Sequence, residues 1–438
     1  MDERKNPGPD EDEPGVTEGP RGSVPPQHEG PDEPNGPVER HHRAYTFRPG
    51  EVLISAADIP LLGGPDVMAQ RSALRRPSAG ERNERDTTLE NLGIERWLTM
   101  TEDADVPAIV EDLRTPVSDR AKRSGDTVPE VVPRVFPDHG FYAHWHDWWP
   151  HGRHLRVGQP LASLPPRGFL PLPGSGVIVG VLDSGIRPGG VDWYDGRVSS
   201  RVPDDEDAPN AAAPGDDLRG HGTHVTGIVL QYAPGVRVIA RRVRGLSERL
   251  VYDSDVAVGI CDLATAGADI IVCCFGGPAH DNLPALATDA AINELRRTKP
   301  GLIVVASAGN SGVFIPYFPA ALDTVIAVGA VRAETDVRTD FSNHGAWVDA
   351  AAPGENVPST FLLDEPYKGW ATWSGTSTAA PKVAAAIAKE RAPGGWRQFV
   401  WFLRPRTARQ AAYRLLNNPR RTWNPEVGTV IREEPYVA

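Results

Sequence analysis

The chain has 438 residues, enough to build a large hydrophobic core within two or three domains. Its formal net charge of −12 excludes a general nucleic-acid binder, because no basic surface is available to neutralise phosphates. No apolar stretch is long enough to cross a bilayer, so we expect neither nucleic-acid nor membrane partners.

Two features of the sequence favour a cytoplasmic location. The N-terminus, residues 1–9, has no apolar core, so we expect no secretory signal. The chain has three cysteines, and neighbouring cysteines rarely meet disulfide geometry. We predict that Cys261, Cys273 and Cys274 are buried, small apolar residues in a reducing compartment.

The N-terminal third divides into a tail and a small folded region. Residues 1–42 are rich in proline, glycine and acidic side chains, which predicts a disordered acidic tail. Residues 43–136 predict an α+β region, with polar residues 64–90 as a loop inside it. Its helix is expected at 105–113, with Asp105 as the N-cap. Its strands are expected at 45–54, 93–98 and 128–136.

Residues 137–172 predict a connector rich in proline and aromatic residues. Imidazole is a good ligand for zinc or copper, and this segment holds four histidines at 144, 146, 151 and 154. Their spacing matches no metal motif, and the neighbouring tryptophans favour packing on another surface. We therefore predict a structural role there and no metal site.

Residues 173–438 show alternating strand and helix patterns. This alternation predicts an α/β fold of three layers, with helices on both faces of a mostly parallel central sheet. Strands are expected at 176–183, 235–243, 269–275, 301–307, 324–330 and 347–351. Helices are expected at 221–232, 253–267, 283–298, 376–391, 395–403 and 407–416.

Four motifs in this part carry side chains that are typical of a serine nucleophile and its partners. Asp183 ends an apolar strand, and His221 opens a helix of small residues. Asn310 ends a later strand within Ala-Gly-Asn-Ser-Gly. Ser377 lies four residues before Pro381, and proline is tolerated only in the first turn of a helix. Ser377 is therefore expected at a helix N-terminus, where the dipole favours a developing anion.

These motifs resemble those of the subtilisin-like serine proteases, the subtilases or peptidase S8 family. The matching segments are Val-Leu-Asp-Ser-Gly at Asp183, His-Gly-Thr-His-Val-Thr-Gly at His221 and Gly-Thr-Ser-Thr-Ala-Ala-Pro at Ser377. The order Asp, His, Asn, Ser is also the subtilisin order. The resemblance covers residues 173–391 and implies a subtilisin-like fold, with Asp192 at a position where relatives often bind calcium. Because its companion ligands are missing, we favour a solvated turn aspartate there.

The resemblance also implies a role for each motif residue. His221 is expected to take the proton of Ser377 during attack on a carbonyl, while Asp183 holds the imidazole tautomer. Asn310 and the Ser377 amide are expected to stabilise the oxyanion. Ser377 Oγ and a ring nitrogen of His221 should lie close to hydrogen-bond reach. His224, three residues on from His221, is predicted to be a packing residue.

The chain departs from its relatives in the strand that resembles their substrate-lining segment. Cys274 and Phe275 replace serine and leucine there, whereas Gly276 and Gly277 keep the close approach to substrate possible. We predict substrate binding at these four residues. If Phe275 faces the cleft, the pocket before the scissile bond should be apolar and narrowed, while Cys274 is expected to be inert.

The sequence thus predicts a serine endopeptidase that hydrolyses peptide bonds in a restricted peptide or protein substrate and needs no cofactor. By its position, the 43–136 region resembles the propeptide of subtilases, an inhibitor and folding aid. Two alternatives stay open. One is a dedicated peptide-maturation protease or transpeptidase, and the other is a catalytically silent scaffold.

Overall fold

The catalytic part is built on a nine-stranded sheet with the order β17-β18-β14-β13-β12-β11-β7-β9-β8. All neighbours along it are parallel except β17 and β18. In this computed structural model the described residues are 40–42, 45–101, 103–115, 132–142, 155–186, 192–200, 220–243, 250–363, 365–395 and 406–436. The strands are β7 Ile178–Asp183, β8 Val198–Ser200, β9 Arg237–Arg242, β11 Ile270–Cys273, β12 Ile303–Ser307, β13 Val325–Val331, β14 Ala350–Pro353, β17 Trp423–Asn424 and β18 Gly428–Val430.

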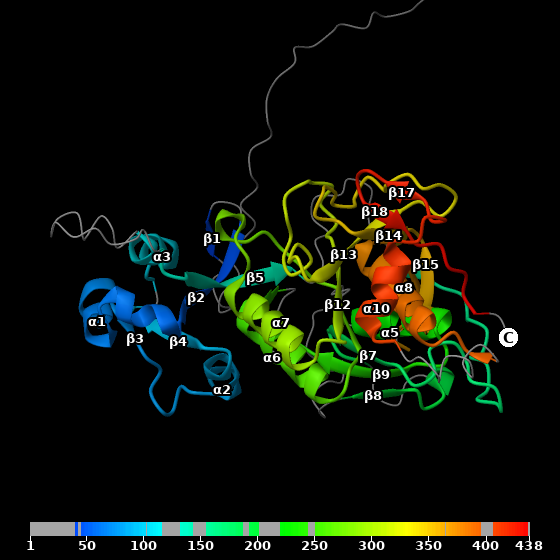
Figure 1. Cartoon of the computed structure of the whole chain (residues 1–438), viewed down its shortest axis with the longest axis horizontal. Helices are drawn as coiled ribbons and strands as arrows, with labels where there is room; N and C mark the ends of the chain where they lie inside the picture. The colour runs from blue at the N-terminus through cyan, green and yellow to red at the C-terminus, as the bar shows by residue number, and fades with distance from the viewer. Residues whose placement is uncertain are drawn as a thin grey trace, which may run out of the picture. The chain divides into compact units, whose positions relative to one another are not determined.

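Helices cover both faces of this sheet, as Figure 1 shows. Alternate strand residues point to opposite faces, so Val179 and Val272 join one core while Leu182 and Ile271 join the other. The first core also contains residues of α5, α8 and α10, and the second contains residues of α6 and α7. These helices are α5 His221–Tyr232, α6 Asp253–Thr265, α7 Leu286–Thr298, α8 Thr376–Arg391 and α10 Ala408–Leu416. The predicted three-layer α/β fold is therefore confirmed.

The N-terminal region, which we define as residues 40–142 as far as they are described, forms a second sheet. This sheet is antiparallel with the order β10-β5-β2-β4-β3, and β1 pairs with β2. One of its strands, β10, comes from the catalytic part and pairs with β5. The strands are β1 Arg40–His42, β2 Tyr45–Ser55, β3 Leu74–Arg75, β4 Ile94–Thr99, β5 Val135–Tyr142 and β10 Leu250–Tyr252. The helices are α1 Pro65–Ser72, α2 Glu84–Asn91 and α3 Val106–Arg114.

A third sheet and three 3₁₀ helices complete the described elements. The sheet has the order β15-β16-β6, with antiparallel pairs between β15 Val357–Thr360, β16 Trp370–Trp373 and β6 Arg156–Val157. The 3₁₀ helices are η1 Ala56–Leu62, η2 Asp192–Tyr194 and η4 His280–Asn282. Asp192, weighed above as a calcium ligand, begins η2. Among the described residues, no group of three or more histidine, cysteine, aspartate or glutamate side chains could hold a metal ion.

Several expectations are wrong in detail. The strand expected at 128–136 runs instead from Val135 to Tyr142, because its register is set by pairing with β2 and β10. It therefore crosses into the segment expected to be a connector. The polar stretch 64–90 is not a loop: it contains α1, β3 and α2, and Asn83 with Asp86 forms a capping box at the start of α2. Residues 40–42, assigned above to the tail, form β1.

Some expectations concern residues outside the described part of the chain. These are the four histidines between 144 and 154, most of the helix expected at 395–403, and residues 1–39 of the tail. Among the described residues, no helix is long and apolar enough to cross a membrane.

Candidate active site

Asp183 and His221 form a buried pair at one edge of the parallel sheet. Asp183 is the last residue of β7, and His221 is the first residue of α5. The distance from His221 Nδ1 to Asp183 Oδ1 is 2.8 Å, and the residues are only 2% and 4% exposed. The same carboxylate oxygen accepts a hydrogen bond from the Ser184 amide at 2.7 Å. A carboxylate on Nδ1 places the proton there and leaves Nε2 as the basic nitrogen.

Aromatic packing holds the His221 ring in one orientation. The Trp373 ring lies edge-on to it, with centroids 4.9 Å apart and an interplanar angle of 86°. Trp373 also packs against His224, with a centroid distance of 5.6 Å. Burial, and next the charge of His221, lower the pKa of His224 well below its usual value. A neutral His224 does not oppose a positive charge on His221, which agrees with its predicted role in packing.

Ser377 lies in the first turn of α8, as its distance from Pro381 predicts. Ser377 and Asn310 border the same space beside Gly375. A Cβ atom placed on Gly375 would lie 3.1 Å from Ser377 Oγ and 3.3 Å from Asn310 Nδ2. Asn310 Oδ1 accepts hydrogen bonds from the Thr376 amide at 2.8 Å and the Thr376 hydroxyl at 2.9 Å. With Oδ1 used in this way, the Nδ2 donors are left for a ligand beside Ser377.

The structure thus brings the four candidate catalytic residues into two contacting pairs, Asp183 with His221 and Asn310 with the start of α8. The hydroxyl of Ser377 makes no hydrogen bond in this structure, and its closeness to a ring nitrogen of His221 stays a prediction. Catalytic hydrogen bonds are often long before substrate binds, and Trp373 links His221 to the segment that leads into Ser377.

Two of the residues predicted to bind substrate, Cys274 and Phe275, are buried. The Cys274 thiol points into the core and donates a hydrogen bond to the Ser377 carbonyl at 3.5 Å. Its burial raises the pKa of the Cys274 thiol well above the usual value, which agrees with the inert role we expected. Phe275 belongs to the opposite buried cluster, together with Phe141 and Phe318. The pocket narrowed by Phe275 stays a prediction, because in this structure Phe275 shares its cluster with Phe141 of the N-terminal strand β5.

Comparison with known proteins identifies the family. The model of the subtilase family matches residues 174–421, more than half of the chain. The chain belongs to the subtilase family. A thermophilic serine proteinase from Bacillus sp. (strain AK1) is 38% identical over 184 residues, which make up 39% of this chain and 42% of that protein. The chain thus matches less than half of that relative's length.

Two further relatives extend the comparison. Subtilisin BL from Lederbergia lenta is 34% identical to this subtilase over 240 residues, which make up 51% of the chain and 79% of that protein. A solved cold adapted subtilisin-like serine proteinase is 28% identical and covers 64% of this chain and 96% of its own, with a TM-score of 0.45.

Main-chain atoms of this subtilase's own N-terminal region lie against Gly277, one of the residues predicted to bind substrate. A Cβ atom placed on Gly277 would lie 3.2 Å from the Gly140 carbonyl oxygen and 3.5 Å from Phe141 Cα. The same strand, β5, pairs with β10 in antiparallel register, with Phe141 opposite Val251, and with β2 on its other edge. The end of this N-terminal strand therefore contacts both β10 and Gly277. No pattern in the sequence indicates this arrangement, because β10 has only three residues.

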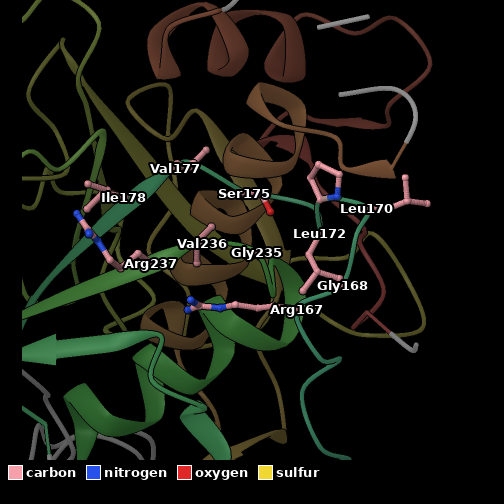
Figure 2. Close-up of a pocket in the computed structure, with 12 residues that line it drawn as sticks. Arg167, Gly168, Leu170, Leu172, Ser175, Val177, Ile178, Gly235, Val236 and Arg237 are labelled. Atoms are coloured by element: carbon pink, nitrogen blue, oxygen red, sulfur yellow. The ribbon is translucent and has the colours of Figure 1, made fainter. Parts of the chain in front are cut away.

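A separate cavity of about 450 Å³ lies at the other end of the central strands (Figure 2). It is lined near the start of β7 by Val177 and Ile178, and near the start of β9 by Val236 and Arg237. Asp183 stands at the opposite end of β7. None of the four candidate catalytic residues lines this cavity. We therefore do not assign the chemistry of this subtilase to it.

Proposed function

We propose that this chain is a serine endopeptidase that hydrolyses peptide bonds through Asp183, His221 and Ser377. The observation that carries the proposal is the Asp183–His221 pair at 2.8 Å, beside a serine and an asparagine that border one space. A hydroxyl is a weak nucleophile near neutral pH, so a base must take its proton as it attacks. Only a buried, oriented imidazole supplies that base among these residues.

The reaction then follows from the placement of these groups. Ser377 Oγ attacks the substrate carbonyl carbon, and its proton passes to His221 Nε2. Asp183 stabilises the imidazolium that forms. The carbonyl oxygen becomes an oxyanion, to which Asn310 Nδ2 and the Ser377 amide donate hydrogen bonds at the N-terminus of α8. His221 returns the proton to the leaving amine, and water then cleaves the acyl-enzyme by the same route.

We further propose that the N-terminal region inhibits this site. The proposal is supported by its strand β5, which pairs with β10 and contacts Gly277, one of the residues predicted to bind the substrate strand. Phe141 is fully buried in the cluster that contains Phe275. This region, predicted from sequence at 43–136, thus extends at least to Tyr142.

An ionic network also holds the N-terminal region to the catalytic part. Arg48 lies 3.0 Å from Asp138, binds Asp255 and stacks over the Tyr252 ring at 4.0 Å. Asp138 accepts hydrogen bonds from the amide and hydroxyl of Ser254 at 2.9 and 2.8 Å. Charged groups that are buried and mutually paired fix one docking geometry, and losing one partner leaves the other uncompensated.

Covalent labelling tests the catalytic proposal. We expect a fluorophosphonate probe to react with the protein, Ser377→Ala to abolish the reaction, and His221→Ala to slow it by orders of magnitude. The matched control is Ser199→Ala, in the edge strand β8, which should label normally. Each variant is also made together with Arg48→Ala and Phe141→Asp, so that a blocked groove is distinguished from an inert serine. Labelling that is equal with and without Ser377, or absent in every background, overturns the proposal and favours a silent scaffold.

The reaction products separate hydrolysis from transpeptidation, the remaining alternative. An acyl-enzyme can be intercepted by water or by an amine. We propose hydrolysis of a restricted substrate, in keeping with the cytoplasmic location predicted above. Mass spectrometry of a cleaved peptide, with and without an added amine, should then show only free carboxyl termini.

A further inference from the structure

The ends of β11 and β12 separate beside the proposed catalytic centre, and one side chain fills the gap between them. The two strands are paired as far as Cys273 and Ala306. Beyond these residues the chain continues to Gly276 on one side and to Gly309 on the other. Tyr317 spans the space between these glycines. Its Cβ lies 3.8 Å from a Cβ placed on Gly276, and its ring atom Cδ2 lies 2.7 Å from one placed on Gly309.

Tyr317 is held firmly in this position. Its side chain and backbone are only 8% exposed, and its hydroxyl lies 3.0 Å from the Ser311 hydroxyl, which satisfies both groups. The next residue, Phe318, exchanges two backbone hydrogen bonds with Gly277, at 3.1 and 2.8 Å. The tyrosine is therefore anchored at its backbone and at its phenol group, and neither anchor leaves the ring free to swing aside.

The ring also packs against residues that position the oxyanion donor. Gly309 donates its amide to the Thr376 hydroxyl at 3.1 Å, and Ser311 follows Asn310 directly. A substrate whose carbonyl oxygen binds Asn310, and whose backbone follows Gly276 and Gly277, must direct one side chain between these two segments. That side chain belongs to the residue whose carbonyl is attacked. Its space is where the Tyr317 ring lies.

We propose that Tyr317 closes the pocket for the residue before the scissile bond, so that only glycine, alanine or serine is accepted there. This inference rests on the endopeptidase function proposed above and names the substrate class of the same site. It names a different residue from Phe275, which sequence alone suggested, because the Tyr317 ring lies against Gly309, beside Asn310, and its Cβ lies near Gly276. A large side chain could enter only by displacing a buried, hydrogen-bonded ring, which a close-packed interior resists.

Peptide substrates that differ only at this position test the proposal. They carry alanine, leucine or phenylalanine before a chromogenic leaving group. The assays use a full-length form that reacts with the fluorophosphonate probe. We expect kcat/KM to be about 100-fold higher for alanine than for phenylalanine, in the range by which pocket size discriminates substrates. Tyr317→Ala should raise the phenylalanine value at least about tenfold and change the alanine value by less than about threefold.

Two further variants serve as controls for the role of ring size. Tyr317→Phe keeps the ring and loses the phenol group, so it should keep the preference for alanine. Ser311→Ala removes only the partner of that hydroxyl and should do the same. If kcat/KM for the phenylalanine substrate rises in Tyr317→Ala but not in these two variants, the ring itself is what excludes large side chains.

The outcomes distinguish the two proposals. Absence of probe labelling in every background counts against the endopeptidase and says that the site is inert. Normal labelling with equal cleavage after alanine and phenylalanine by the wild type overturns the Tyr317 proposal alone. If Tyr317→Ala labels normally but keeps the wild-type ratio of kcat/KM between the alanine and phenylalanine substrates, the Tyr317 proposal is overturned as well. If Tyr317→Ala does not fold, Tyr317→Leu and the wild-type profile still decide.

Discussion

At the scale of single residues, side chains that take no part in bond making define the site. Thr376 orients the Asn310 amide through two hydrogen bonds, and Trp373 packs on the ring of His221. Gly222, next to His221, lies so close to the loop after Asp183 that a Cβ atom on it would be 2.1 Å from the Gly185 carbonyl oxygen. The contact is with backbone, so no side-chain rotation can relieve it.

Gly222→Ala should therefore disable the site without unfolding the protein. The added methyl group must push His221 away from Asp183, and misplacement by about 1 Å costs on the order of 100-fold in rate. The measurement is the rate of fluorophosphonate labelling, with circular dichroism as a check on folding. Gly168→Ala is the matched control, because a Cβ there meets nothing within 4 Å. Equal labelling rates in the two variants would show that the approach of α5 to the Asp183 loop is not needed.

Asn310→Ala should reduce turnover by about 10²–10³, a magnitude taken from the corresponding asparagine of subtilisin, a member of the same family, and not calculated from these distances. The Oδ1 contacts with Thr376 mean that the variant also frees the start of α8. Asn310→Asp separates the two effects, since it keeps an acceptor for Thr376 but removes the Nδ2 donors. Steady-state kinetics should show a lower kcat for both variants, and full activity of Asn310→Asp would argue against an oxyanion role.

Lys382, in α8, provides a prediction about pH. The residue is 6% exposed, its Nζ donates to the Pro353 carbonyl at 2.8 Å, and burial lowers its pKa to about 8, against a smaller opposing effect of Glu434. An unfolded lysine has a pKa of about 10.4, so between these values the unfolded state binds more protons and the free energy of unfolding rises with pH.

Relative to Lys382→Met, the wild type should therefore gain up to about 3 kcal/mol of stability between pH 7 and pH 10. Urea unfolding measures the difference, with Ser377→Ala in both proteins to prevent self-digestion. The comparison between variants cancels the titration of other groups, including the buried cysteines. If the difference in the free energy of unfolding between the two proteins stays constant across this range, folding does not lower the pKa of Lys382.

At the scale of helices and strands, the sequence predicts those elements whose ends are marked by residues close together in the chain. The helices at 221–232 and 376–391 have the predicted ends, because a glycine before each and small residues within each mark them. The strand expected at 128–136 is displaced, since apolar runs do not show which partner strand will set the register. The loop expected at 64–90 is wrong because two eight-residue helices with weak amphipathic patterns resemble polar loops in sequence.

The same distinction applies to the site. Asp183, His221, Asn310 and Ser377 are found from sequence, because each lies in a short motif that carries its own local structure. Tyr317 and Trp373 are not, because their importance comes from contacts with residues distant in the chain. The position of β5 beside β10 also joins segments more than a hundred residues apart, and no local pattern encodes that pairing.

Weakening the attachment of β5 should activate the protein. Phe141→Asp places a charge in a fully buried apolar cluster, and Arg48→Ala removes the nearer of the two arginines, Arg48 and Arg85, that pair with Asp138 and Asp255. Both changes should increase the rate of probe labelling by at least about tenfold, because each removes more than about 1.4 kcal/mol from docking. Arg82→Ala is the control, since Arg82 forms its ion pair with the exposed Glu90, within the N-terminal region. A well-folded double variant that labels no faster than wild type would remove the case for inhibition.

At the scale of the whole molecule, the N-terminal region has its own core and shares another with the catalytic part. Its own core contains Trp97, Phe47 and Met68. The shared cluster joins Leu53, Leu89 and Phe136 to residues of α6 and α7. Apolar contact, a continuous antiparallel sheet and the Arg48 network all act at this boundary. Together they couple the stability of the two parts.

This coupling predicts how the molecule unfolds. Full-length Ser377→Ala should unfold in one calorimetric transition, because the shared sheet and cluster make the folding of each part depend on the other. Adding Arg48→Ala and Phe141→Asp weakens two of these links and should split the transition. The earlier transition should belong to the N-terminal region, whose separate core is the smaller one. Protease digestion between the two transition temperatures should then degrade the N-terminal region and leave the catalytic part intact. One transition in the triple variant, or two in Ser377→Ala alone, would show that the Arg48 network and Phe141 do not control the attachment.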